Sequence, residues 1–571
     1  MKFINKRFCK GVWHLFKGYW NSEEKWKARG LLGVVIALDF AAVYILVLLN
    51  QWNNTFYNAL QNYDQGEFLS LIGKFAILAF IHIAIAVYAI YLQQMLQIKW
   101  RKWMTNCYLD EWLHNQTYYK MQTLEDKTDN PDQRISEDIN QFVSLTLGLS
   151  LGFLKKTATL GAFIVILWNL SGMITLPIGS KQFTIYGYMV WLSILYAVIG
   201  TYLAAKIGNP LVRLNYDQQR YEADFRFNMV RLRENSESVA FYGGEKPEKT
   251  GLLVRFEQVF KNYWSLMNYQ KRLTWFTNGY GQLAIIFPIL MAAPRYFSGA
   301  MQLGGLIQTL RAFGEVQDAL SFFVDSYTSI AQWQAVVKRL LGFVDHMETV
   351  EKLKIETTIV EANVKRLAIQ NLTVALPNGE ALLQNVSLQV SGGEKLLITG
   401  ASGCGKSTFM RTISGIWPFG KGSIVIPQGQ TRLFLPQRPY LPLGSLKEAI
   451  LYPRESVMTD DEKIKAVMKE CQLSEFISRL DDIDDWSRIL SLGEQQRIAF
   501  ARVLLIKPEW VFLDEATSAL DEPTEKIMYE LLVAQLPNAS IISIGHRNTL
   551  VNYHQKKLHL IGDGSWGLET I

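Results

Sequence analysis

The stretch Gly400-Ala401-Ser402-Gly403-Cys404-Gly405-Lys406-Ser407-Thr408 fits the pattern G-x-x-x-x-G-K-[ST] of a phosphate-binding loop. The mostly apolar residues 394–399 predict a short strand that enters the loop, and residues 407–416 predict a helix that leaves it. Glycines let successive backbone N–H groups converge on a phosphate, and the start of a helix adds partial positive charge. We therefore expect Lys406 to reach the β- and γ-phosphates of a nucleotide and the Ser407 hydroxyl to bind magnesium. A chance glycine-rich turn is the alternative, and the strand–loop–helix context argues against it.

Two acids follow a second predicted strand. The apolar residues 511–513 lead directly into Asp514 and Glu515. Magnesium prefers oxygen ligands, so Asp514 at the strand end is predicted to hold the ion through its coordinated waters. Glu515 is the best candidate to polarise the attacking water. Acids at strand ends can also simply cap the next helix, but the phosphate loop upstream favours the catalytic interpretation.

Two further polar residues follow apolar runs. Gln437 comes after such a run and could reach magnesium or the attacking water, although a glutamine in a loop usually has no such role. His546 ends the strand predicted over 541–544, where it is suited to contact the γ-phosphate, although a lone histidine is more often structural. Neither residue indicates a nucleotide site alone. Each supports one only together with the phosphate loop and the two acids at 514 and 515.

The segment 490–497 opens a helix predicted over 495–506. Its Ser491 hydroxyl and Gly493 N–H would lie at a helix N-terminus, which is a natural anion site. Ser491 could equally be an ordinary N-cap. The two interpretations are compatible, so both are kept.

Composition predicts a membrane protein. Of the 571 residues, 49% are hydrophobic and 12% aromatic, whereas only 19% are charged. The net charge of +6 is too small to argue for a nucleic-acid partner. The four cysteines are far apart and predict neither a zinc site nor a disulfide framework. No small-residue cleavage site follows the first apolar run, so no signal peptide is expected.

Six stretches are predicted to span the lipid bilayer, at residues 31–49, 71–92, 157–170, 186–205, 280–293 and 304–330. Asp39 lies inside the first and needs a partner or water, either on a substrate path or in helix packing. The sixth stretch is charged and should line a cavity or pack against other helices; its charged residues are Arg311, Glu315, Asp318 and Asp325. Residues 1–30 are basic and aromatic, which fits an interfacial amphipathic helix or a solvated tail.

Basic residues orient these spans. The long connections 95–140 and 206–275 are rich in Lys and Arg, whereas the short ones are not. The positive-inside bias places the N-terminus, both long connections and the C-terminal half in the cytoplasm. Helical periodicity at 98–114 and 211–234 predicts that membrane helices continue into these connections. The expected domains are an N-terminal segment, a transmembrane domain, a linker and a nucleotide-binding domain, at 1–30, 31–342, 343–363 and 364–571.

Six elements of the second half occur in an order that resembles the ATP-binding cassette (ABC) family. They are the phosphate loop, Gln437, 490–497, Asp514–Glu515, 518–521 and His546. The resemblance implies that two cassettes enclose two ATP molecules head to tail with Mg²⁺. Each ATP would lie between the phosphate loop of one chain and the 491–494 segment of the other, its nucleotide-binding residues including Ser491, Gly493, Glu494 and Asp521. With one cassette and one membrane half, the chain is expected to be a half-transporter that forms a homodimer.

The membrane half is similar to one ABC branch, that of the bacterial SbmA/BacA-like transporters and the peroxisomal fatty-acyl transporters. The matching segments of this half are 130–135, 222–226 and 235–238 with 240–244, and the segments 436–440 and 444–446 of the second half point to the same branch. The resemblance implies a six-span α-helical transmembrane domain of the exporter type joined to an α/β P-loop ATP-binding cassette. It also implies a bacterial cytoplasmic membrane location and a cargo among cobalamin-like solutes, peptides and acyl lipids.

Three positions depart from the common ABC pattern. Leu492 replaces a glycine and Glu494 replaces a glutamine, which the resembled branch tolerates. Leu376 stands where many cassettes stack an aromatic side chain on adenine. Apolar contact would replace that stacking, which predicts weaker discrimination between nucleotide bases.

The main hypothesis is an ATP-driven transporter that works by alternating access, with a slight preference for import. Glu515 would act as the base, while Lys406, His546 and magnesium stabilise charge. An exporter of lipids or acyl compounds is one alternative. An ATP-gated channel or regulator is another, and the intact Glu515 and 491–493 segment argue against it.

Overall fold

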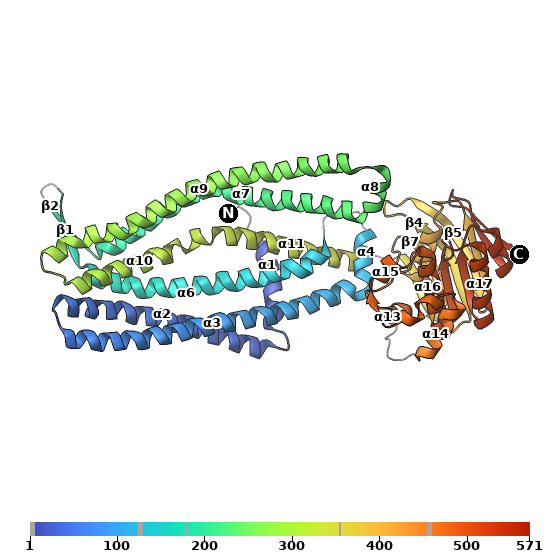
Figure 1. The fold of residues 1–571 in the computed structure, drawn as a ribbon, viewed down its shortest axis with the longest axis horizontal. Helices are drawn as coiled ribbons and strands as arrows, with labels where there is room; N and C mark the ends of the chain where they lie inside the picture. The colour runs from blue at the N-terminus through green and yellow to red at the C-terminus, as the bar shows by residue number, and fades with distance from the viewer. Residues whose placement is uncertain (1–5, 124–129, 179–180, 353–355, 454–459) are drawn as a thin grey trace. The chain divides into compact units, whose positions relative to one another are not determined.

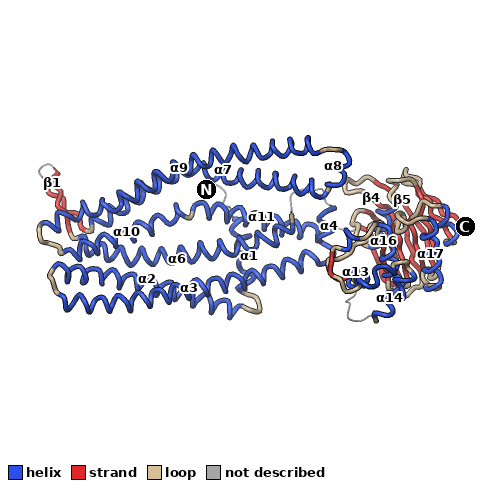
Figure 2. The backbone as a smooth tube through the Cα atoms, viewed as in Figure 1, coloured by secondary structure: helices blue, strands red, loops and turns tan. Residues whose placement is uncertain are grey.

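The computed structural model describes residues 6–123, 130–178, 181–352, 356–453 and 460–571. Residues 1–5 of the predicted N-terminal segment and 353–355 of the predicted linker lie outside the described residues. The chain divides into two compact units, one formed by 1–110 with 130–344 and the other by 111–129 with 345–571. Long helices build the first unit, and strands with shorter helices build the second (Figures 1 and 2).

The first unit is a bundle of long helices that begins with a short amphipathic one. Its main helices are α1 (Lys6–Trp20), α2 (Lys25–Gln61), α3 (Gln65–Leu113), α6 (Ile139–Ser171), α7 (Tyr188–Glu234), α8 (Ser236–Tyr242), α9 (Glu245–Phe297), α10 (Leu303–Asp325) and α11 (Tyr327–Glu351). Helix α5 (Pro131–Gln133) and a π-helical turn (Arg134–Asp138) lead into α6, and the antiparallel hairpin of β1 (Met173–Ile178) and β2 (Lys181–Tyr186) joins α6 to α7.

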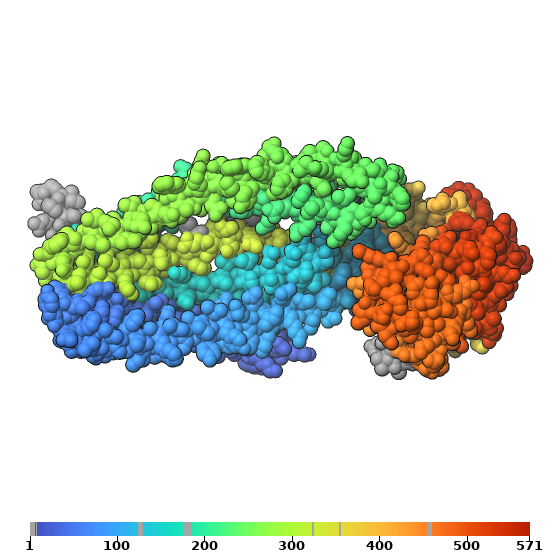
Figure 3. Space-filling model, viewed as in Figure 1, coloured from blue at the N-terminus to red at the C-terminus, as the bar shows by residue number. Residues whose placement is uncertain are grey.

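Five of the six predicted membrane spans lie in long helices that continue beyond the apolar stretches. The sixth, 304–330, is not among the described helices that are long and apolar enough to cross a membrane, and it is divided at Ser326 between α10 and α11. Five helical stretches of the described chain are long and apolar enough to cross a membrane, at Lys25–Gln61, Gln65–Thr123, Pro131–Ser171, Tyr188–Glu234 and Glu245–Phe297. Helix α3 runs on to Leu113 and α7 to Glu234, as the periodicity predicts. The α7–α9 pair forms a separate ridge along one edge of this unit (Figure 3).

The charged sixth stretch forms α10, which packs against α2, α6, α7 and α9. Its Ala312, Phe313 and Val316 are buried in one cluster with residues of α6 and α7. Side-chain amides fix α10 to α2 as well, since Asn54 Nδ2 donates to Gln308 Oε1 at 2.6 Å. The two helices approach closely at Gly304, where an added Cβ would lie 1.9 Å from a backbone oxygen of α2. The expectation that this helix packs against other helices is confirmed.

Two sequence questions about the first unit have structural answers. Asp39 of α2 is paired, because Lys155 Nζ of α6 lies 3.3 Å from its Oδ1. Helix α1 is not a solvated tail over residues 6–20, because Tyr19 and Trp20 are buried and Tyr19 stacks on Trp100 with ring centroids 5.8 Å apart. The apolar face of α1 therefore packs on protein.

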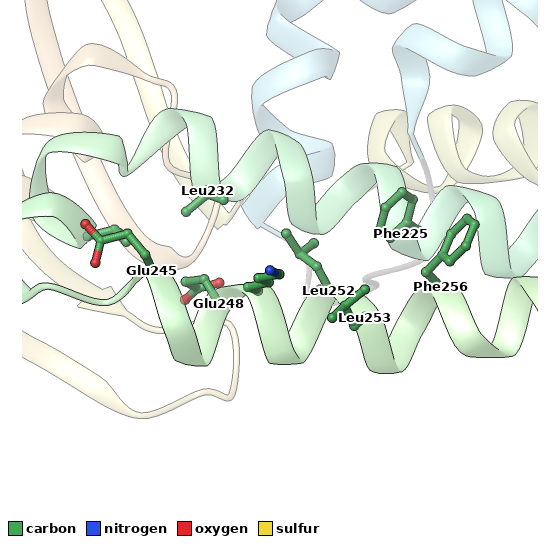
Figure 4. Close-up of a pocket in the computed structure, with 9 residues that line it drawn as sticks. Phe225, Leu232, Glu245, Glu248, Leu252, Leu253 and Phe256 are labelled. Atoms are coloured by element: carbon green, nitrogen blue, oxygen red, sulfur yellow. The ribbon is translucent and has the colours of Figure 1, made fainter.

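A cavity of about 460 Å³ opens between α7 and α9 beside α8 (Figure 4). Six apolar side chains line it, Phe225, Leu232, Val239, Leu252, Leu253 and Phe256, together with Glu245, Glu248 and Lys249. None of these residues belongs to the predicted nucleotide site.

The second unit contains a six-stranded sheet, a four-stranded sheet and a two-stranded sheet of β9 (Gly444–Ser445) and β10 (Ile483–Asp484). The six-stranded sheet has the order β14-β13-β6-β12-β11-β8, with all neighbours parallel except β14. Its strands are β6 (Lys395–Gly400), β8 (Arg432–Leu435), β11 (Trp510–Asp514), β12 (Ser540–Ile544), β13 (Lys556–Leu560) and β14 (Trp566–Thr570). The four-stranded sheet has the order β3-β7-β4-β5 and consists of β3 (Glu356–Ala362), β4 (Arg366–Ala375), β5 (Ala381–Ser391) and β7 (Gly420–Pro427).

Helices complete the second unit around two buried apolar cores. They are α4 (Thr117–Thr123), α12 (Lys406–Ser414), α13 (Leu446–Leu451), α14 (Asp461–Glu470), α15 (Trp486–Ile489), α16 (Leu492–Ile506) and α17 (Glu522–Gln535). Strands β11 and β12 are buried along almost their whole length, as expected for central parallel strands. The predicted α/β architecture is therefore confirmed.

Candidate nucleotide site

The predicted site residues lie at or just after the ends of four adjacent parallel strands. Strands β8, β11, β12 and β6 are neighbours in the sheet, so their carboxyl ends lie along one edge. Gln437 follows β8, Asp514 ends β11, His546 follows β12, and the phosphate loop follows β6. In open α/β sheets ligands bind at this edge, which explains how residues far apart in sequence meet.

The phosphate loop needs its glycines. Gly400, Gly403 and Gly405 have φ angles of +150°, +83° and +95°, which side chains other than glycine rarely adopt. A Cβ at Gly400 would also lie 2.4 Å from the carbonyl oxygen of Leu560. Helix α12 begins at Lys406, so its free N–H groups face the loop. This geometry fits a phosphate.

Lys406 lies within the loop. It is buried, and its Nζ donates to the carbonyl oxygens of Gly400 at 3.0 Å and Ala401 at 2.8 Å. Cys404 is buried beside Gly400 and makes this part of the loop compact. A positive charge thus lies where the sequence predicts contact with phosphate.

Ser407 and Asp514 meet as predicted for a shared magnesium site. The Ser407 hydroxyl donates to Asp514 Oδ1 at 2.9 Å. Burial raises the pKa of Asp514, and the hydrogen bond from Ser407 opposes that shift. A hydroxyl and a carboxylate are the oxygen ligands that magnesium prefers, and a bound cation favours the ionised carboxylate. The donor set therefore fits Mg²⁺.

Glu515 lies between two predicted partners. His546 Nε2 donates to Glu515 Oε1 at 3.0 Å, and Gln437 Nε2 donates to Glu515 Oε2 at 2.9 Å. The φ angle of Glu515 is +49°, a left-handed conformation that is uncommon outside glycine and often occurs at functional sites. The backbone thus turns at the strand end, and the carboxylate faces both the histidine and the glutamine.

Ser491 caps α16, which begins at Leu492, three residues before the predicted start. The Ser491 hydroxyl donates to Glu494 Oε2 at 2.8 Å, and the Ser491 N–H donates to the same oxygen at 2.8 Å. In the described part of the chain, the side-chain bonds of Ser491 and Glu494 stay within this cap and Arg497. One chain thus brings together the phosphate loop, Gln437, Asp514, Glu515 and His546, but it does not bond them to Ser491 or Glu494.

Gly493 and Asp521 lie at the starts of neighbouring helices. A Cβ at Gly493 would lie 3.2 Å from the carbonyl oxygen of Ala519, so the start of α16 contacts the 518–521 segment. Asp521 caps α17, and a hydrogen bond from Thr524 lowers the pKa of its carboxyl. Both predicted residues therefore belong to one part of this unit.

Two buried polar residues of α16 were not predicted. Gln496 is 0% exposed, donates to the carbonyl oxygen of Gln437 at 3.0 Å, and accepts from the N–H of Ala519 at 3.0 Å. Arg502 donates to the carbonyl oxygens of Tyr440 and Ala449, both at 2.6 Å, and burial lowers its pKa to about 10. Both residues could have been found from the sequence as polar residues on a helix face that is otherwise apolar, because buried polar groups need hydrogen-bond partners.

Leu376 is expected to give weak base selectivity. It is half-buried against the core of the second unit, so it offers an apolar contact and no aromatic ring. Hydrolysis rates with ATP and GTP should therefore differ by less than about fivefold, and Leu376→Tyr should tighten ATP binding by about fivefold through stacking. Matched rate and binding measurements with both nucleotides check this. A strong preference for ATP in the unaltered protein would refute it.

Comparison with known families covers both halves of the chain. The family model described as ABC transporter transmembrane region 2 matches residues 15–297, and the ABC transporter model matches residues 383–518. ABC transporter D family member 2, chloroplastic, of Arabidopsis thaliana is 35% identical over 644 residues, covering 99% of this chain and 89% of that protein. The inner membrane ABC transporter ATP-binding protein YddA of Escherichia coli is 34% identical over 535 residues, covering 93% and 94%.

More distant matches extend the comparison. The human lysosomal cobalamin transporter ABCD4 is 26% identical over 582 residues, covering 94% of this chain and 93% of that protein. A solved bacterial Atm1-family ABC exporter with ATP bound has a TM-score of 0.73 at 17% identity, covering 94% and 96%, which shows a shared fold. These matches confirm the exporter-type fold expected from the sequence. The chain therefore belongs to the ABC transporter family, as a half-transporter with a membrane domain and an ATP-binding domain that is related to the D-type transporters.

Proposed function

We propose that two copies of this chain form an ATP-driven transporter of the SbmA/BacA-like branch that imports a hydrophilic solute by alternating access. The observation that carries the proposal is that, within the described part of one chain, the phosphate loop and the catalytic candidates lie together but are not bonded to the Ser491 cap. The phosphate loop and Glu515 come together, whereas the hydrogen bonds of the Ser491 cap remain local. A second copy supplies the missing cap, so ATP is enclosed between the two copies and stabilises their closed state.

The chemistry of this site is hydrolysis of ATP by water. Glu515 accepts the proton of the attacking water, because its carboxylate is already oriented by His546 and Gln437. Lys406 and His546 stabilise the charge that develops on the γ-phosphate. Ser407 and Asp514, with Gln437, would hold Mg²⁺, which supplies charge neutralisation when bound.

Polar cargo fits the charges carried by the helix bundle. Arg311, Glu315 and Asp318 lie on α10, and the electrostatic interactions of Glu315 include Lys156 of α6. Ionisable residues are costly in a membrane interior and commonly mark a substrate path. The name of one relative, lysosomal cobalamin transporter, adds corrinoids to peptides as cargo classes.

The membrane is proposed to be the bacterial cytoplasmic membrane. The distribution of basic residues supports a cytoplasmic N-terminus and a cytoplasmic ATPase domain. A relative of similar length bears the printed name of an inner membrane transporter, which is consistent with this location.

Reconstituted vesicles test the pump directly. The purified protein in lipid vesicles should show ATPase activity that rises at least about twofold with its cargo, screened across cobalamin, cationic peptides and acyl-CoA. Vesicles with outward-facing ATPase domains should lose that solute from the lumen against its gradient when ATP is added outside, since import moves cargo toward the ATPase side. Movement only down the gradient would indicate a channel. Movement into the lumen would indicate an exporter, and stimulation by acyl-CoA alone would favour the lipid alternative.

A further inference from the structure

Helix α17 carries a buried carboxylate below the site. Glu525 is 2% exposed and has no part in the predicted nucleotide contacts. An ionised carboxylate removed from water is costly unless hydrogen bonds and an opposite charge compensate it. The partners of Glu525 therefore show how its buried charge is compensated.

The carboxylate holds the segments that follow the two catalytic candidates. The Thr517 hydroxyl donates to Glu525 Oε2 at 2.7 Å, two residues after Glu515 in the chain. The Thr549 hydroxyl donates to Glu525 Oε1 at 2.9 Å, three residues after His546. The two oxygens of one side chain thus link the end of β11 to the end of β12.

Arg547 adds the compensating charge and a third connection. Its Nη1 lies 3.4 Å from Glu525 Oε2 and makes no hydrogen bond in the described part of the chain, so the carboxylate is the group that balances it. Its Nη2 donates to the carbonyl oxygen of Leu520 at 2.7 Å, directly before Asp521. Arg547 itself follows His546, so the ion pair connects the histidine to the 518–521 segment.

We infer that Glu525 is a positioning residue for the proposed hydrolysis of ATP, which it serves without touching nucleotide. By holding both loop segments, it maintains the 3.0 Å contact between His546 and Glu515. Through Arg547 it also fixes the segment that ends at Asp521, which is expected to face the second copy. The inference rests on the proposed function, because it assigns a role in that reaction.

Replacing the carboxylate tests this role in the full-length protein. Glu525→Gln removes the charge and replaces one carboxylate oxygen with an NH2 donor, which cannot accept the hydrogen bond that this oxygen receives. The value of kcat for ATP should therefore fall about tenfold or more. KM for ATP should stay within about twofold, because the phosphate loop is untouched. Glu525→Asp should recover part of kcat. Glu530→Gln, the same change at an exposed position of α17, should leave kcat unchanged.

A second variant keeps the test informative if the first folds poorly. Thr517→Val conserves shape and removes only one hydroxyl donor to Glu525, so kcat should fall about threefold with KM unchanged, while the thermal unfolding midpoint falls by only a few degrees. Unaltered kcat in both Glu525→Gln and Thr517→Val would overturn the inference while leaving ATP hydrolysis intact. A rise in KM together with a lowered unfolding midpoint would also overturn it, in favour of a purely structural residue. Absence of hydrolysis in the unaltered protein would overturn both proposals.

Discussion

Glu515→Gln should bind ATP as the unaltered protein does and hydrolyse it at least about 100-fold more slowly. The glutamine has nearly the same shape but cannot accept the proton of the attacking water. It also loses the negative charge that receives hydrogen bonds from His546 and Gln437. Steady-state phosphate release and equilibrium ATP binding check the two halves of this expectation.

The control for that substitution is Glu530→Gln, which removes a carboxylate from an exposed site in the same unit. Its turnover should match that of the unaltered protein. Hydrolysis by Glu515→Gln at the normal rate would remove Glu515 from the role of base. Loss of ATP binding in that variant would show instead that the carboxylate shapes the binding site.

Ser491→Arg should also lower the rate of ATP hydrolysis at least about 100-fold. The phosphate loop of the same chain should still bind ATP. The arginine would occupy the space where the cap of one copy meets the nucleotide of the other. It also removes an N-cap, which costs about 1 kcal/mol of stability. On the purified variant, phosphate release measures the rate of hydrolysis and equilibrium nucleotide binding measures the retained affinity for ATP.

The chain offers a matched control for the lost cap. Ser445 caps α13 through the same reciprocal bonds, with Glu448 in the place of Glu494. Ser445→Arg should therefore cost similar stability and retain most of the turnover. Equal loss of turnover in both variants would attribute the effect of Ser491→Arg to helix capping alone.

Local sequence patterns predicted the parts of the site that are contiguous. The phosphate loop lies between a strand and a helix as expected, since its glycines and the Lys406–Ser407 pair act through adjacent backbone groups. Helices α3 and α7 also followed from periodicity over many turns. The start of α16 was predicted three residues late, because Ser491 and Glu494 form a reciprocal cap that extends the helix.

Contacts between distant segments could not be read from the chain. The left-handed backbone of Glu515 occurs where its N–H donates to the carbonyl oxygen of Ile544 at 3.1 Å, on another strand. Gln496 and Glu525 act through partners from separate loops, so nothing adjacent in sequence marks them. The packing of α1 on Trp100 depends likewise on a helix that comes much later in the chain. These features need the sheet order and helix packing.

Mixing two inactive variants tests most directly whether the ATP site is shared between two copies. Lys406→Ala lacks the loop lysine, and Ser491→Arg lacks the cap, so each forms only inactive homodimers. A mixed dimer joins the intact loop of one chain to the intact cap of the other, and co-expression should restore about a quarter of the normal ATPase sites. A mixture no more active than its separate components would contradict the account, because each chain would then hydrolyse ATP alone.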